Sequence, residues 1–171
     1  MNLLARSVLL GALLLVGCSD DDDVDGPDGN PNANGSVTAT ANPGGSFSGV
    51  VGAAAVRSGT GLGFAATAIS GSSSKTITFA LQNVTASGTF QIGGNTSVNF
   101  ASWIESPGGG TSQSWTVSAA GGTGSVIIQT LTSTRVTGTF NLSSMIPTPG
   151  SGATGNKAVT GSFDVAIQQQ Q

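Results

Sequence analysis

The feature that most constrains this fold is a two-residue alternation of apolar and polar side chains. In residues 76–82, Ile77, Phe79 and Leu81 alternate with Thr, Ala and Gln. Successive side chains of a β-strand point to opposite faces, so this spacing predicts a strand with one apolar and one polar face. The same pattern predicts strands at four further places: 113–119, 125–131, 135–142 and 158–167.

No segment carries a sustained helical stripe, so the sequence predicts an all-β domain. About eight or nine strands with short connections favour an antiparallel meander folded as a sandwich or a barrel. We expect this single domain to span residues 44–167, with a Gln tail at 168–171.

A short motif recurs in the predicted strands: Gly, then Thr or Ser, Phe, any residue and an aliphatic residue. It lies at 88–92, 138–142 and 161–165. Its Gly, Phe and aliphatic residue share one face of a strand. Because Gly leaves room for an aromatic ring from the neighbouring strand, the three Phe side chains are expected in the core.

Taken in order, these motifs resemble a family of uncharacterised bacterial lipoproteins of the Bacteroidetes type. The likeness spans residues 75–167 and ends in the segments RVTGTF (135–140) and VTGSFDV (159–165). It implies a shared all-β fold. It carries over no catalytic residue, because the matched positions are structural Gly and Phe.

The N-terminal residues predict export and lipid attachment. An apolar run over 8–16 is shorter than the ~20 residues of a spanning helix and is typical of a signal peptide, here residues 1–17. The run ends in Leu-Val-Gly-Cys, which resembles a lipobox and predicts cleavage between Gly17 and Cys18. The resemblance implies acylation of Cys18, with fatty acids such as palmitate, and hence attachment to a membrane.

Residues 18–43 are expected to form a disordered tether, because six of the eight acidic residues lie between Asp20 and Asp28. An acidic run after the cysteine resembles the export signal of Bacteroidetes-type surface lipoproteins, which implies the outer membrane and the cell surface.

The acidic run also permits a calcium interpretation. The carboxylates of Asp21, Asp23 and Asp25 match the opening of an EF-hand-like loop. The twelfth position of that loop is Asn32 instead of a carboxylate, so a solvated charge run is favoured and no metal or cofactor is predicted.

Missing residue types exclude most enzyme classes. The chain has no His and no Tyr, and its one Cys is the predicted anchor, which excludes His- or Cys-based triads and metal sites. The alternative is an envelope hydrolase acting on glycans through Glu105 and Asp164. Ser72 and Lys75 match S-x-x-K, but their segment is a predicted turn before a strand, not a helix start.

Charge gives no support for a nucleic-acid partner. From residue 29 onward, four dispersed basic residues against two acidic ones give a net charge of +2 without a basic patch.

Trp103 is the candidate ligand contact. The alternation puts it on a face with Glu105, opposite Phe100 and Ile104, whereas Trp115 is predicted in the core. There Trp103 either packs under a loop or a sheet edge or, as a partly exposed aromatic ring, offers a large contact area to a sugar or a protein. The chain is therefore expected to be a lipid-anchored, non-catalytic module that binds a glycan or an envelope protein, or that has a structural role at the cell surface. A barrel that holds an apolar ligand is the remaining alternative.

Overall fold

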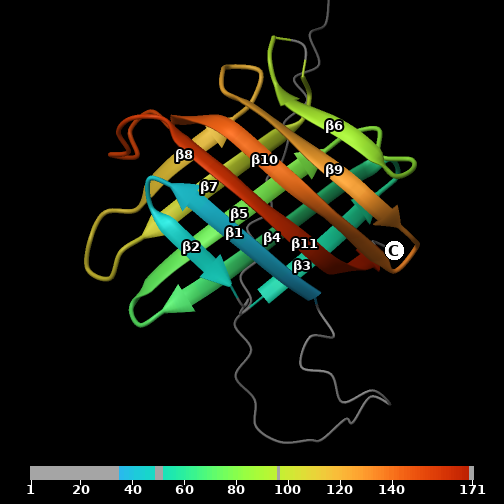
Figure 1. Cartoon of the computed structure of the whole chain (residues 1–171), viewed down its shortest axis with the longest axis horizontal. Coiled ribbons are helices and arrows are strands. Elements are labelled where there is room, and N and C mark those ends of the chain that lie inside the picture. The colour runs from blue at the N-terminus through green and yellow to red at the C-terminus, as the bar shows by residue number, and fades with distance from the viewer. Residues whose placement is uncertain (1–34, 49–51, 96, 170–171) are drawn as a thin grey trace, which may run out of the picture. The chain divides into compact units, whose positions relative to one another are not determined.

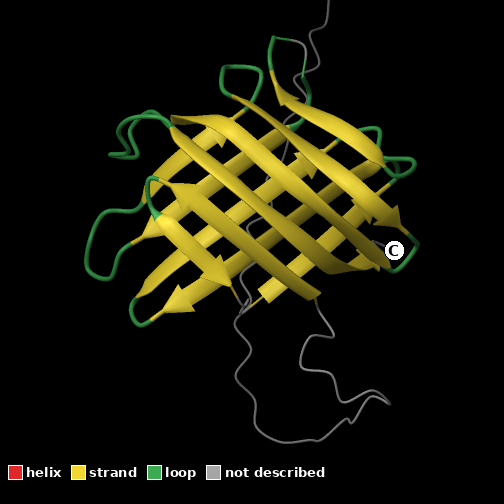
Figure 2. Cartoon of the chain, in the orientation of Figure 1, coloured by secondary structure: helices red, strands yellow, loops and turns green. Residues whose placement is uncertain are grey.

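The computed structural model describes residues 35–48, 52–95 and 97–169, which form eleven strands and no helix (Figure 2). The strands are β1 (Gly35–Asn42), β2 (Gly45–Ser48), β3 (Gly52–Ser58), β4 (Gly61–Ser70), β5 (Ser73–Leu81), β6 (Gly88–Gly93), β7 (Phe100–Ser106), β8 (Gln113–Val117), β9 (Thr123–Leu131), β10 (Arg135–Pro147) and β11 (Lys157–Gln169). The predicted all-β class is confirmed, with more strands than the sequence predicts.

The strands lie in two layers that cross at an angle. Figure 1 shows β1, β2, β6, β9, β10 and β11 in front of β3, β4, β5, β7 and β8. Aromatic side chains from both layers meet between them. The ring centroids of Phe64 and Phe163 are 4.6 Å apart, and those of Phe79 and Phe140 are 5.0 Å apart. These four buried rings fill part of the space between the layers.

β10 and β11 pass from one layer into the other. Most of β10 pairs with β9 and β11, but Ile146 and Pro147 pair with β8, after a bulge that follows Leu142. Most of β11 pairs with β1 and β10, but its last three residues pair with β3 in parallel. The ladder therefore runs β11-β3-β4-β5-β7-β8-β10 and returns to β11, with β2 and β6 at the edges. Among the described strands, β11 and β3 pair in parallel, whereas the sequence predicts an antiparallel sheet.

The Gly–Phe motif packs in β10 and β11 as the sequence predicts. Gly138 lies opposite Phe163 in register, and Phe140 lies opposite Gly161. A Cβ atom built at Gly138 would stand 2.6 Å from Cζ of Phe163, so each ring covers a bare glycine backbone. The copy at 88–92, on the edge strand β6, has a half-buried Phe and no described atom within 4 Å of its glycine's Cβ position.

Two predicted domain boundaries are wrong. β1 begins at Gly35, inside the predicted tether 18–43, and it is ordered because it pairs with β2 on one side and β11 on the other. Its inner residues are small, which is why a strand resembles a linker there. β11 continues to Gln169, inside the predicted tail 168–171, because its last residues pair with β3.

Candidate binding site

The inner faces of the rear strands change from apolar to polar toward one end. The last fully apolar row across β4, β5, β7 and β8 is Ala66, Ile77, Trp103 and Trp115. The next row on the same face is Ala68, Lys75, Glu105 and Gln113. Polar side chains therefore take positions that point into the space between the layers.

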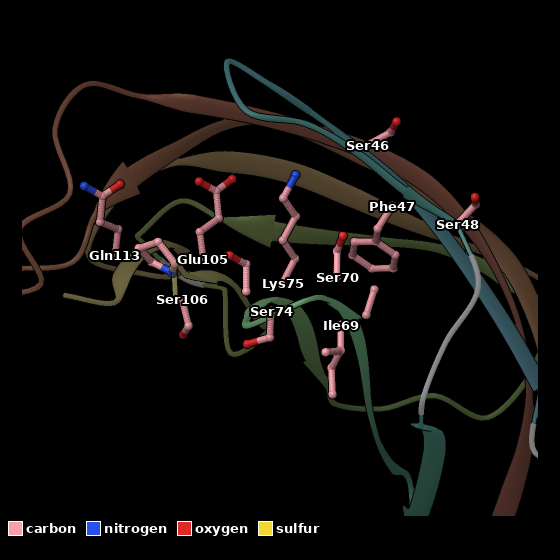
Figure 3. A pocket seen from close by; sticks show the side chains of 13 residues that line it. Ser46, Phe47, Ser48, Ile69, Ser70, Ser74, Lys75, Glu105, Ser106 and Gln113 are labelled. Carbon is pink, nitrogen blue, oxygen red and sulfur yellow. The ribbon is translucent and has the colours of Figure 1, made fainter. Parts of the chain in front are cut away.

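These side chains line a pocket of about 730 Å³ (Figure 3). The front layer covers it with Phe47 of β2, whose ring is stacked on Trp103 with centroids 5.5 Å apart. Figure 3 shows Ser70, Lys75 and Glu105 pointing into one space. A volume of a few hundred cubic ångströms, bounded by apolar walls and a few polar groups, is typical of small-molecule sites.

Glu105 is held from the core side by two donors. Lys157 Nζ and Trp103 Nε1 donate to its Oε1 atom at 2.5 and 2.8 Å. The Lys157 side chain is 3% exposed, and its Nζ atom lies 3.7 Å from the ring centroid of Trp115. A carboxylate and an aromatic face therefore stabilise this buried cation together.

Lys75 is less constrained. Its Nζ atom donates one hydrogen bond of 2.7 Å to the carbonyl oxygen of Gly44, in the turn between β1 and β2. It lies opposite Glu105 in register but forms no ion pair with a carboxylate of the described residues. Because an ammonium group has three N–H donors, two remain for other partners.

In comparisons with known proteins, no protein-family model, curated protein or solved structure matches the chain. The resemblance to Bacteroidetes-type lipoproteins stays a prediction, and the pocket is interpreted from its own residues.

The predicted exposure of Trp103 is wrong. Its side chain is 0% exposed, and its indole N–H is bonded to Glu105. The alternation is correct but the faces are reversed, because Phe100 and Ile104 lie on the partly exposed side of β7. Trp103 is a wall of the core and offers no surface to a ligand. The prediction that Trp115 lies in the core is confirmed, with 4% of its side chain exposed.

Glu105 and Asp164 are not brought together. Glu105 binds Lys157 at the start of β11, and Asp164 lies seven residues further along that strand, or about 23 Å at ~3.3 Å per residue. Asp164 also faces outward, where it forms an ion pair with Arg135 and raises the pKa of that guanidinium above its ordinary value through its hydrogen bond and its charge. Two-carboxylate glycosidases need a separation of roughly 5–9.5 Å.

The other predicted site residues divide into two groups. Ser72 lies in the hairpin turn before β5 and Lys75 lies in the strand. The two residues are therefore not on a helix, which the S-x-x-K motif requires. Cys18, with its predicted cleavage site after Gly17, lies outside the described residues, as do the calcium candidates Asp21, Asp23 and Asp25.

The described part of the chain holds no cluster of three or more His, Cys, Asp or Glu side chains placed to bind a metal ion. It also contains no helix of the length and apolarity required to span a bilayer.

Sequence reasoning did not single out Lys157 or Phe47 as site residues, and it considered Lys75 only as part of the S-x-x-K match. Long cationic side chains are usually solvated, so their place in the alternation was the only available signal. Lys75 lies on the same face of β5 as Ile77, which is buried. A polar side chain on the buried face near the end of a strand indicates that the apolar core ends there and leaves room for a pocket.

Proposed function

We propose that the chain is a lipid-anchored cell-envelope lipoprotein whose β domain is a non-catalytic binding module, with the pocket between the layers as its binding site. The row of polar side chains on the inner face supports the binding role. Inward-facing polar groups cost stability unless they are bonded or solvated. Lys75 is half-buried and Gln113 is exposed, so both side chains are open to solvent and available to contact a ligand in the pocket.

The same pocket gives little support to catalysis. Its titratable side chains are Lys75 and Glu105. Glu105 accepts hydrogen bonds from Lys157 and Trp103. Its candidate catalytic partner Asp164 lies on the outer face of β11, where it pairs with Arg135. A binding role therefore explains the arrangement with fewer assumptions than hydrolysis.

The anchoring part of the proposal is tested at Cys18. The full chain, expressed in a Gram-negative host fed an alkyne analogue of palmitate, is expected to carry the label in the membrane fraction. Because the chain has one cysteine, Cys18→Ser should abolish labelling. Labelled Cys18→Ser protein, or unlabelled membrane-free native protein, would contradict the anchor.

The binding part is tested with the full chain purified in detergent and screened against a panel of glycans and purified envelope proteins. Ser70→Trp should block the pocket, because Ser70 lines it and is exposed. Thr160→Trp adds the same ring to the exposed outer face of β11 and serves as the control. Binding that both variants retain would place the binding surface elsewhere.

A further inference from the structure

We infer that the pocket between the layers takes a polyhydroxylated ligand that carries an oxyanion, either a carboxylate or a phosphate, with Lys75 as its charged contact. This inference rests on the proposed function, because it names the ligand class of the same pocket. It depends on which charges and hydrogen-bond donors of the lining remain available.

The charges at the pocket favour an anion. Lys75 and Lys157 contribute two positive charges and Glu105 one negative charge. Lys157 is buried and paired with Glu105, so among the described residues the uncompensated charge at the pocket lies on Lys75. Because charges interact more strongly beside protein than in bulk water, this ammonium group attracts an oxyanion and repels an amine.

Lys75 is also positioned for the contact. Its hydrogen bond to the Gly44 carbonyl holds Nζ near the front layer, and two N–H groups remain. Hydrogen bonds from an ammonium group to an oxyanion are stronger than those to a neutral hydroxyl. The anionic group of a ligand is therefore expected at Nζ of Lys75.

The remaining lining suits hydroxyl groups. The side chains of Ser70 and Gln113 line the pocket and have no hydrogen-bond partner among the described residues. Lys75, Glu105 and Gln113 lie opposite one another on consecutive strands, so strand spacing puts Lys75 and Gln113 about 10 Å apart. That length suits a ligand of two or three sugar rings, with an apolar ring face against Phe47.

An apolar ligand fits less well. A lipid tail in this pocket would remove water from Lys75 and Gln113 without replacing their hydrogen bonds, which is costly for polar groups. The anionic, hydroxylated class is the one that satisfies these side chains.

The test titrates the full chain in detergent with four probes. These are trigalacturonic acid, its neutral counterpart galactotriose, galactose 6-phosphate and the cationic glucosamine trimer. Calorimetry should show trigalacturonic acid binding about tenfold or more tighter than galactotriose, with an affinity that falls as salt is added. The phosphate probe shows which oxyanion is preferred.

Variants locate the effect at the charge. Lys75→Met should remove the preference for the anionic trimer, and Lys75→Arg should retain it. Arg57→Met is the matched control, because Arg57 also forms no ion pair within the described residues and its Nη2 atom donates to a carbonyl oxygen, that of Val84. Its loss should leave the affinities unchanged.

Each contrary outcome overturns a defined statement. Equal binding of the acidic and neutral trimers, a preference that survives Lys75→Met, or tighter binding of the cationic trimer overturns the ligand class. If Ser70→Trp still abolishes that binding, the pocket remains a binding site. If none of the four probes binds, the proposed ligand class is also wrong. The wider screen of glycans and envelope proteins then decides separately whether the pocket binds any ligand.

Discussion

Replacing Glu105 by Gln should destabilise the fold far more than replacing the other ion-paired carboxylate. Lys157 is 3% exposed, so Glu105→Gln leaves a buried cation without an opposite charge, beside the Trp115 ring and a neutral amide oxygen in place of the carboxylate. Breaking a buried ion pair by removing one partner costs about 3–5 kcal/mol. Glu105 itself is 21% exposed and water reaches it, so we expect a loss near the lower limit, about 3 kcal/mol.

The matched control is Asp164→Asn. The Arg135 and Asp164 side chains are 44% and 43% exposed, so water replaces the lost partner. Exposed pairs contribute about 0.2–1 kcal/mol, and this variant should lose no more than that.

Urea unfolding of the full chain, followed by tryptophan fluorescence, measures both losses. Trp103 and Trp115 both contact the buried pair, so their emission reports its environment directly. Circular dichroism should give the same transition if unfolding is two-state. Equal losses in the two variants would refute the argument. A double variant, Glu105→Gln with Lys157→Met, should recover part of the stability, because no unpaired charge stays buried.

Two further variants test the packing. Gly161→Ala would push a methyl group against the Phe140 ring and the Thr38 carbonyl oxygen, at a cost of about 1–3 kcal/mol or more. The control is Gly63→Ala, whose Cβ atom would meet nothing closer than 3.7 Å and which should cost nothing. Similar urea midpoints for Gly161→Ala and Gly63→Ala would contradict the packing role of the Gly–Phe motif. Phe47→Ala removes the ring that covers Trp103, so it should lower the free energy of unfolding by about 3 kcal/mol and shift the tryptophan emission to longer wavelength. An unshifted spectrum would mean that Phe47 does not shield Trp103 from water.

How far the sequence predicts the fold depends on how strongly each strand separates its faces. β5 places large apolar residues on one face only, so its strand and orientation are both predictable. β7 carries large apolar residues on both faces, so the alternation predicts the strand but not which face is buried, and Trp103 is assigned to the wrong one. β1 carries mostly Ala and Thr, and its order depends on neighbours that no local pattern reveals.

The site was predictable only in part for a related reason. The sequence identifies Glu105 as a candidate, but its partner Lys157 lies 52 residues away and meets it only because β11 crosses the other layer. The pairing of Lys75 with Glu105 depends on the register of β5 against β7. Register across non-adjacent segments is a property of the assembled sheet.

The central place of β11 determines when this fold becomes complete. Gly35 pairs with Val165, 130 residues later, and β11 also supplies a neighbour to β10 and β3. Such distant pairings form slowly, because a long loop must close before any contact is gained. Until β11 arrives, β1, β3 and β10 have unpaired edges that invite association with other chains. A chain cut before residue 157 should therefore aggregate instead of forming a smaller domain, and for a protein exported as we propose, late closure keeps the chain unfolded during passage.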